Sequence, residues 1–357
     1  MPNRSRSPGQ QTRAALMIAV FLAGFSATSL AIGARFPLPH DFLMQNKMDE
    51  FRRSANPYNL IFLGPSTTYR HFNAELFDQR LAAAGHLIHS YNMGAPAMHI
   101  CEGQYLLRRL LAMKSQHIDW VLLDLDLSID KFGHNPESRR YIAWHDLKAT
   151  GCDMRTILSS DRHVIEKLKR LYFTVKAAVF RFSNAGVFSK LAGDRIMPPA
   201  PSIEERDYLT LARQGFMPLD KESDSSFPKR NRKFLAQTDV FQQNVQQLQD
   251  LTLPYKPPPE TITNILFREK FLDFLDANAV NTYFYITPSW GQDESYLNFA
   301  SEKTKRRILA LNDIHRYPEL YDLDYRFDLH HLNNNGASVL TMMAAEQFSG
   351  HLDRSEQ

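Results

Sequence analysis

The chain has 357 residues, of which 43% are hydrophobic and 23% are charged, and its formal net charge is +3 at pH 7. That composition supplies enough apolar material for a large core. This net charge is too small to indicate a protein that binds nucleic acid. The sequence also has no stripe of Lys and Arg that alternates with aromatic residues. Two cysteines, Cys101 and Cys152, allow one optional disulfide and no disulfide framework. Because neither they nor the His330-His331 pair have metal-ligand spacing, we expect no metal site.

The N-terminal segment has the composition of a membrane anchor. An uncharged stretch spans 14–34 and follows a short segment, 1–13, that contains three arginines. As a helix this stretch is about 30 Å long, which matches one bilayer core. Positive charge before a span predicts that 1–13 is cytoplasmic and that everything after Arg35 is periplasmic or otherwise extracytoplasmic. A cleaved signal peptide is the alternative, because Ser29-Leu30-Ala31 and Ile32-Gly33-Ala34 both end in small residues.

The rest of the chain alternates between two kinds of apolar pattern. Residues 35–57 contain three prolines and mixed charge, and we expect a linker there. Beyond it the expected strands are 60–63, 86–91, 120–123, 282–286 and 320–323. The expected helices are 73–84, 99–113, 164–182, 237–251, 260–278, 295–311 and one that begins at Asn335. Strands that alternate with helices predict an α/β fold with a doubly wound, flavodoxin-like parallel sheet.

This alternation is interrupted in the middle of the chain. Between 133 and 259 the helical periods are separated by polar loops that contain proline. We therefore expect 58–132 and 260–353 to form one catalytic domain, and 133–259 to be a mainly helical insertion that covers the C-terminal edge of the sheet. Within the insertion, the aromatic side chains of 164–182 are expected to belong to the core.

Two short strings carry side chains suited to nucleophilic catalysis. The apolar run 60–63 stops at Gly64, and Ser66 follows two residues later, so a hydroxyl can stand on a tight turn at a strand end. Near the other end of the chain, Asp328 precedes His331 by three residues, which lets one loop carry both. A serine hydroxyl becomes nucleophilic when an imidazole takes its proton, and a carboxylate fixes the tautomer of that imidazole. In doubly wound sheets the ligand sits beyond the strand C-termini, where these residues are expected.

These strings resemble the conserved blocks of the SGNH, or GDSL-type, hydrolases. Gly64-Pro65-Ser66 is similar to the block that carries the nucleophile, with proline in place of the usual aspartate, and Asp328-x-x-His331 is similar to the last block. Gly94, after the second strand, matches the glycine whose N–H helps to form the oxyanion hole, together with the N–H of Ser66. For the third block, Gly133-His134-Asn135 is the nearest match, but it lies about nine residues past its strand. Asn135 is the corresponding oxyanion donor.

The resemblance covers about 57–130 and 260–350 and implies a serine esterase or O-acyltransferase. The segment 62–77 looks most like membrane-associated members that modify cell-envelope glycans, such as those in alginate acetylation or teichoic acid D-alanylation. It implies an acylated glycan substrate, a membrane-embedded acyl-donor protein as a partner, and no metal or organic cofactor. Two other functions stay open: a catalytically silent glycan-binding or scaffold protein, and an esterase that acts on lipids or small esters.

Several other polar or aromatic residues lie near the predicted strand ends. The spacing of three residues from Asp328 selects His331 over the adjacent His330 as the catalytic imidazole. His71, five residues after Ser66, is expected to face solvent. Trp290 and Gln292 follow the strand at 282–286, where a sugar could stack, but ordinary loop packing is the favoured interpretation.

Overall fold

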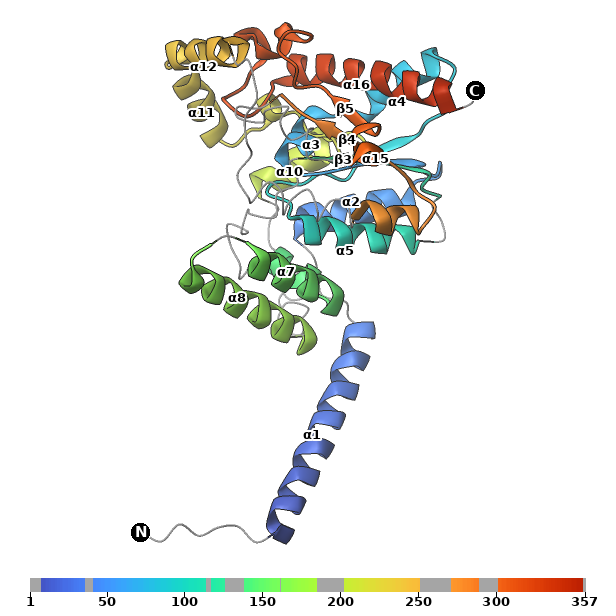
Figure 1. Cartoon of the computed structure of the whole chain (residues 1–357), viewed down its shortest axis with the longest axis vertical. Coiled ribbons are helices and arrows are strands. Elements are labelled where there is room, and N and C mark those ends of the chain that lie inside the picture. Colours follow the sequence, from blue (N-terminus) through green and yellow to red (C-terminus); the bar gives the residue numbers. More distant parts are fainter. Residues whose placement is uncertain are drawn as a thin grey trace.

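In the computed structural model of the protein, the described residues are 8–35, 41–113, 117–125, 138–160, 162–184, 202–250, 271–288 and 301–355. A long N-terminal helix, α1 (Pro8–Arg35), projects from a body of helices around a sheet (Figure 1). Its segment Gly9–Arg35 is long and apolar enough to cross a membrane, and only 6% of its most apolar window is buried. The predicted apolar helix is therefore present, and it could anchor the protein.

The body is built on a five-stranded sheet in which every strand pair is parallel. The strands are β1 (Leu60–Leu63), β2 (Ser90–Asn92), β3 (Trp120–Asp124), β4 (Asn281–Ile286) and β5 (Ile308–Ala310). Their spatial order is β2-β1-β3-β4-β5, which is the flavodoxin-like order of a doubly wound sheet. The α/β class and the parallel sheet predicted from the sequence are confirmed.

Helices cover both faces of this sheet, which explains why its strands are apolar on both sides. One face carries α2 (Phe42–Arg53) and α5 (Ile100–Leu111), and the other carries α4 (Ala74–Ala83) and α16 (Asn334–Ser355) (Figure 1). Along β1, Ile61 and Leu63 belong to the first core while Leu60 and Phe62 belong to the second. All four side chains are fully buried, and each such burial is worth about 1.5–3 kcal/mol.

Two elements differ from those expected. The fifth strand is β5, inside the segment predicted as a helix at 295–311, whereas the predicted strand at 320–323 lies in two short 3-10 helices. These are η2 (Pro318–Tyr321) and η3 (Leu323–Tyr325). Leu320 is fully buried beside α16, so its apolar character reflects burial of a 3-10 turn. A short apolar run does not by itself distinguish these states.

The segment predicted as the linker 35–57 is also different, because its residues 42–53 form α2. Met44, Met48 and Phe51 of this helix are buried in the first core. Its Lys47 is fully buried, and the ammonium donates to the carbonyls of Asn92 (2.8 Å), Gly94 (2.7 Å) and Gly215 (2.7 Å). A buried ammonium with three acceptors ties α2 to the end of β2, so the linker prediction is wrong for this part.

The insertion is helical, as predicted, but its two halves pack in different places. The first half consists of α6 (Arg139–Trp144), α7 (Leu147–Ser159) and α8 (Val164–Phe182), and it packs on α5 and on α1. The second half includes α10 (Ile203–Leu211), η1 (Leu219–Lys221), α11 (Ser226–Leu235) and α12 (Thr238–Asp250). Only this second half reaches the predicted catalytic residues within the part of the chain that the structure describes.

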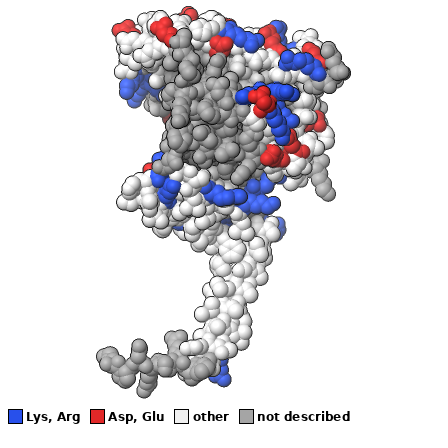
Figure 2. All heavy atoms as spheres, in the orientation of Figure 1, with Lys and Arg blue, Asp and Glu red and all other residues white. Residues whose placement is uncertain are grey.

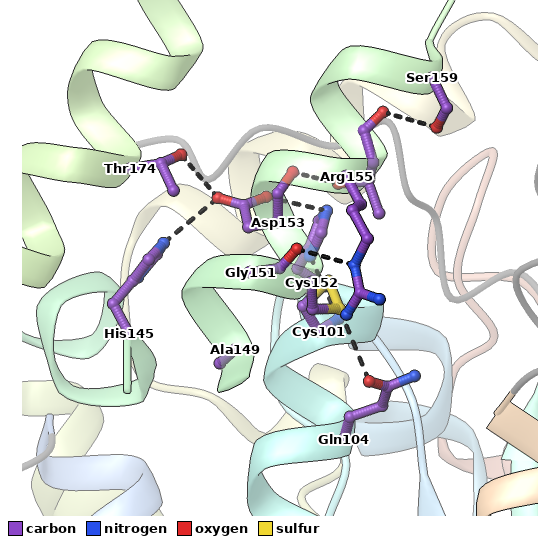
Figure 3. The surroundings of a disulfide bond; sticks show 12 residues. Cys101, Gln104, His145, Ala149, Gly151, Cys152, Asp153, Arg155, Ser159 and Thr174 are labelled. Atoms are coloured by element: carbon purple, nitrogen blue, oxygen red, sulfur yellow. Dashed lines mark hydrogen bonds and ion pairs between the residues drawn. A yellow bond between two sulfur atoms is a disulfide. The ribbon is translucent and has the colours of Figure 1, made fainter. Parts of the chain in front are cut away.

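A disulfide joins Cys101 in α5 to Cys152 in α7, with 5.8 Å between the Cα atoms. Next to it in α7, the buried Asp153 points toward His145 and Thr174 (Figure 3). The optional disulfide of the sequence is therefore formed, and it fastens the first half of the insertion to the body. Disulfides persist mainly in oxidising compartments.

Candidate active site

The turn after β1 positions the serine. Ser66 is the first residue of α3 (Ser66–His71), and Pro65 precedes it in an extended conformation. A Cβ atom at Gly64 would lie 1.9 Å from Oγ1 of Thr68 and 2.5 Å from Cβ of Asp124. Only glycine therefore lets the chain turn here with α3 packed against the end of β3.

Polar side chains at the ends of neighbouring strands hold α3 in place through hydrogen bonds. The buried carboxylate of Asp124, the last residue of β3, accepts hydrogen bonds from the hydroxyls of Thr67 (2.8 Å) and Thr68 (3.2 Å). Nδ2 of Asn92, at the end of β2, donates to the carbonyls of Thr68 (2.7 Å) and Phe72 (2.8 Å). The two bonds to the carboxylate are charge-assisted and therefore stronger than neutral ones, and together with the Asn92 bonds they let neighbouring strands hold the serine turn rigidly.

The structure brings Ser66, His331 and Asp328 together from positions more than 260 residues apart in sequence. Nε2 of His331 lies 3.0 Å from Oγ of Ser66, and Nδ1 of the same ring lies 3.1 Å from Oδ1 of Asp328. Oδ1 of Asp328 also accepts from the backbone N–H groups of His330 (2.7 Å) and His331 (2.9 Å). The spacing of three residues thus closes a turn that aims the imidazole at the serine, while His330 is exposed.

The electrostatics of this group favour an ionised aspartate and a neutral histidine. Burial alone would raise the pKa of Asp328, but the hydrogen bonds from His331 and the His330 amide, with the charge of Arg230, hold the pKa well below its usual range. Burial lowers the pKa of His331; Asp328 acts in the opposite direction, and the charges of Arg230 and Arg70 lower the pKa further. A neutral imidazole with one oriented ring N–H is the form that can accept a hydroxyl proton.

Arg230 of α11 enters the same group from the insertion. Its guanidinium forms an ion pair with Oδ2 of Asp328, and its Nη2 lies 2.7 Å from Nδ1 of His331. Nothing in the sequence around Arg230 indicates this role, because α11 is rich in basic residues throughout. The residue contacts both members of the Asp-His pair, yet its own side chain is 44% exposed.

The insertion also binds the serine helix and the histidine loop. Arg70, next in α3 after the buried Tyr69, forms an ion pair with Glu222, and both side chains are less than 10% exposed. Nδ2 of Asn231 donates to the carbonyl of Phe327 at 2.7 Å. The second half of the insertion therefore lies beside Ser66 and the Asp328–His331 loop. The prediction that the insertion as a whole covers this edge of the sheet stays a prediction.

His71 is placed differently from the expectation. The ring is fully buried, and its Nε2 accepts the backbone N–H of Leu332 at 3.0 Å. Burial and the nearby charge of His331 lower the pKa of His71 well below its ordinary value. The prediction that His71 faces solvent is wrong, and the residue instead links α3 to the segment that follows His331.

Of the three predicted oxyanion donors, the structure describes Ser66 and Gly94 but not Asn135. Ser66 opens α3, so its N–H has no carbonyl partner one turn earlier in that helix. The N–H of Gly94 donates to Oδ1 of Asn92 at 2.9 Å, and its role as an oxyanion donor stays a prediction. Asn135 lies outside the described residues, as do Trp290 and Gln292.

Among the described residues, no group of three or more His, Cys, Asp or Glu side chains is arranged to hold a metal ion. A comparison of the sequence with models of known protein families found no match, and a comparison with curated proteins found none. Function must therefore be inferred from the geometry of Ser66, His331 and Asp328 and from the motifs that contain them.

Proposed function

We propose that the protein is a membrane-anchored, extracytoplasmic serine acyl-ester enzyme of the SGNH type. Its substrates would be O-acyl groups, most simply O-acetyl groups, of a cell-envelope polysaccharide. The observation that carries the proposal is the chain of contacts from Ser66 Oγ to His331 Nε2 (3.0 Å) and from His331 Nδ1 to Asp328 Oδ1 (3.1 Å). Nucleophile, base and orienting carboxylate lie within hydrogen-bond reach of one another, as acyl transfer requires.

The chemistry would proceed in two steps through an acyl-serine. Oγ of Ser66 attacks the ester carbonyl carbon while its proton passes to Nε2 of His331, and Asp328 stabilises the imidazolium. Collapse of the tetrahedral intermediate breaks the bond to the alcohol, which leaves with the proton from Nε2. A water or a sugar hydroxyl then attacks the acyl-serine, gives its proton to Nε2, and releases Ser66.

Charge on the tetrahedral oxygen needs backbone donors. The N–H of Ser66 is the first candidate, and one such donor is commonly worth about 3 kcal/mol of transition-state stabilisation. Gly94 would contribute only if its N–H exchanged Asn92 for the substrate oxygen. Two observations favour a second candidate function, a catalytically silent glycan-binding or scaffold protein. The N–H of Gly94 is already bonded to Asn92, and Arg230 lies beside Nδ1 of His331.

The side chains that the insertion places beside the site indicate which class of substrate it would accept. The side chains it brings to the histidine loop include the polar Arg230 and Asn231 and the aromatic Phe227, whose ring lies 6.5 Å from that of Phe327. Glu222 pairs with Arg70 in the serine helix. Charged and amide side chains suit a polyhydroxylated ligand better than an acyl chain. They therefore support a glycan rather than a lipid ester as the substrate.

Fluorophosphonate labelling tests the proposal directly. The full-length protein in detergent or in vesicles is treated with a tagged fluorophosphonate, digested and mapped by mass spectrometry. We expect one modified peptide that carries Ser66, with no labelling of Ser66→Ala. Absence of labelling in protein that is folded by circular dichroism would favour the silent binding protein.

A second experiment separates transfer from hydrolysis, which share the acyl-serine. The protein is given an acetyl donor with and without glycan oligomers, and acetate release and oligomer mass are followed. Acetylated oligomers formed at the expense of free acetate would support an O-acyltransferase, which would draw its acyl group from a membrane-embedded donor protein. Unchanged acetate release across several glycan classes would support an esterase.

A further inference from the structure

Helix α8 turns polar side chains toward the body and large apolar side chains toward the outside, which is the opposite of the usual arrangement for a protein in water. Toward the body it places Arg170 and Thr174, and the Thr174 hydroxyl donates to the buried Asp153 at 2.8 Å. Toward the outside it places a stripe of apolar side chains, whose exposed fractions run from 37% at Phe180 to 71% at Ile165. We call this stripe the α8 outer face: Val164, Ile165, Leu168, Tyr172, Val175, Val179, Phe180 and Phe182.

The α8 outer face is long and continuous. Six of its members follow one another at steps of three or four residues and so line one side of the helix for about five turns: Ile165, Leu168, Tyr172, Val175, Val179 and Phe182. An exposed apolar stripe of this length marks a surface that another apolar phase covers. The sequence predicted the aromatic side chains of this helix to be core, and that prediction is wrong for Tyr172, Phe180 and Phe182, which are exposed.

The end of α8 packs against α1. The rings of Phe182 and Phe25 lie 6.0 Å apart, and Nδ2 of Asn184 donates to the carbonyl of Ser29 at 2.8 Å. Figure 1 shows one end of α8 beside the upper end of α1, with the rest of α8 leading away from α1 below the sheet. Ser29 and Phe25 are six and ten residues before the last residue of α1, or about 9 and 15 Å along the helix axis. The end of α8 therefore lies beside a part of α1 that an outer leaflet would surround.

The charges around this stripe suit a membrane surface. Between 164 and 182 there are five basic residues and one acidic residue, Glu166, a net charge of +4. Glu166 is paired with Arg162 and Arg170. Figure 2 shows Lys and Arg gathered where the pale shaft of α1 meets the body, with few Asp or Glu beside them. Basic residues that flank an apolar helix face are typical of helices that lie in the headgroup region of anionic bilayers.

A cleft of about 530 Å³ opens at the same level, between α1 and α5, α7 and α8. Leu30, Gly33 and Ala34 of α1 line one side, and the other includes Arg109 and Arg181 together with one carboxylate, Asp146, which is paired with Arg108. The guanidinium groups of Arg109 and Arg181 lie over the ring of Tyr105, at 5.7 and 5.4 Å from its centroid. Two cations beside an apolar helix surface fit the phosphate of a glycerophospholipid whose acyl chains run along α1.

We propose that the α8 outer face rests in the outer leaflet of the membrane that α1 spans. Its apolar side chains would lie at the boundary of headgroups and acyl chains, to the depth of about 5–10 Å that is usual for such helices. The body is then held on the membrane at two places, α1 and α8, with the disulfide tying α7 to α5 above them. This inference depends on α1 being inserted in a membrane and does not depend on the proposed esterase activity.

Nitroxide labels on the full-length protein test this. Because Cys101 and Cys152 are paired, a single introduced cysteine is the free thiol that takes the label. Leu168→Cys and Val175→Cys report on the α8 outer face, and Leu22→Cys on α1 is the lipid reference. Leu87→Cys is the matched aqueous control, because Leu87 is 91% exposed and its neighbour His86 contacts α16, on the other side of the sheet. The labelled proteins are placed in phosphatidylcholine vesicles containing phosphatidylglycerol, and collisions with oxygen and with a water-soluble nickel chelate are measured.

We expect the labels at 168 and 175 to favour oxygen over nickel, as the label at 22 does, and the label at 87 to favour nickel. The proposal is overturned if 168 and 175 are as accessible to nickel as 87, or if 22 itself is not in lipid. Protection that appears only at high protein-to-lipid ratio, with spin–spin broadening, would show that a second copy of the chain covers the face and would equally overturn it.

Paired substitutions provide a second measurement. Leu168→Glu together with Val175→Glu should turn a label at 179 from oxygen-accessible to nickel-accessible, whereas Leu87→Glu should leave it unchanged. None of these positions contacts Ser66 or His331, and near-ultraviolet circular dichroism, which does not depend on esterase activity, reports that each variant is folded. A label at 179 that keeps its lipid signature in the double variant would contradict the proposal.

Discussion

Nη2 of Arg230 lies 2.7 Å from Nδ1 of His331, on the same ring nitrogen that lies 3.1 Å from Asp328. A single nitrogen cannot donate to a carboxylate and accept from a guanidinium at once. When Nδ1 carries the proton it donates to Asp328, and Nε2 is free to take the proton of Ser66. When Arg230 donates to Nδ1, the proton sits on Nε2, and His331 is not a base toward the serine. Arg230 thus opposes the reactive tautomer while its charge holds Asp328 ionised.

The substitution Arg230→Met is expected to move the acid limb of activity to higher pH. Activity requires neutral His331, so it rises as pH increases through the pKa of that ring. Burial and the charge of Arg230 lower this pKa below its ordinary value, and removal of a positive charge raises it. The rate of fluorophosphonate labelling measured against pH checks the shift. Arg232→Met, an exposed change in the same helix, is the control, and an unmoved limb in Arg230→Met would contradict the expectation.

The two adjacent histidines are expected to differ sharply. His331→Ala and Ser66→Ala should each lower the turnover of a small acetyl ester by about 10⁴-fold or more, because the nucleophile and its base act as a unit. Asp328→Ala should cost less, since the carboxylate orients the ring and does not react. His330→Ala should change turnover less than about threefold, as expected for an exposed side chain outside the chemistry. Loss at His330 with retention at His331 would show that the wrong imidazole has been assigned.

Local patterns were enough to predict much of this site. Gly64 and Ser66 follow a strand within a few residues, and the turn from Asp328 to His331 depends only on spacing and on backbone N–H groups that the carboxylate accepts. The parallel sheet follows from alternating elements, since parallel neighbours need helical crossovers. The contact between Ser66 and His331 then follows because both lie at the same edge of the sheet.

Features that depend on distant partners were not predicted. Lys47 is a charged residue in the segment between Pro39 and Pro57, and only the carbonyls of Asn92, Gly94 and Gly215 explain its burial. Arg230 reaches the site through the packing of α11, and no local pattern distinguishes it from its basic neighbours. The apolar stripe of α8 has the period of a helix that packs on a protein core. A helix whose apolar face lies against a membrane has the same period, so the sequence alone does not distinguish the two.

Lys47→Met should destabilise the fold strongly. The substitution keeps the length of the side chain but leaves three buried carbonyls without their ammonium donor. We expect a loss of about 3–5 kcal/mol in the free energy of unfolding, since each unsatisfied buried group costs about 1–3 kcal/mol and part of the cost relaxes. Urea unfolding in detergent, followed by near-ultraviolet circular dichroism, measures it. Lys221→Met at an exposed position is the control, and equal midpoints for the two variants would show that Lys47 is dispensable.

His71 should make the fold sensitive to mild acid. Its pKa is lowered in the folded state by burial, whereas in the unfolded chain it is near 6.5. Below about pH 6.5 the unfolded state therefore binds a proton that the folded state does not, and stability falls by up to about 1.4 kcal/mol per pH unit from this residue. His71→Gln keeps an acceptor for the Leu332 N–H but cannot be protonated.

Unfolding midpoints at pH 5 and pH 7.5 check this dependence. We expect the difference between the two pH values to shrink in His71→Gln and to stay unchanged in His330→Gln, because His330 is exposed. His331 has a lowered pKa as well and contributes a residual slope of the same sign. An undiminished pH dependence in His71→Gln would mean that His71 is not the group that takes up the proton.

The disulfide between Cys101 and Cys152 leads to one prediction about the stability of the fold and one about the cellular compartment of the body. It closes a loop with a sequence separation of 51 residues, for which the chain-entropy relation gives about 4 kcal/mol. Reduction should lower the unfolding midpoint of the wild-type protein and leave the double variant Cys101→Ala, Cys152→Ala unchanged. Because cytosolic thiols are kept reduced, an extracytoplasmic body also predicts that maleimide added to intact membranes modifies neither cysteine unless a reductant is added first. Modification of both without reductant would place them in a reducing compartment and contradict the proposed orientation of α1.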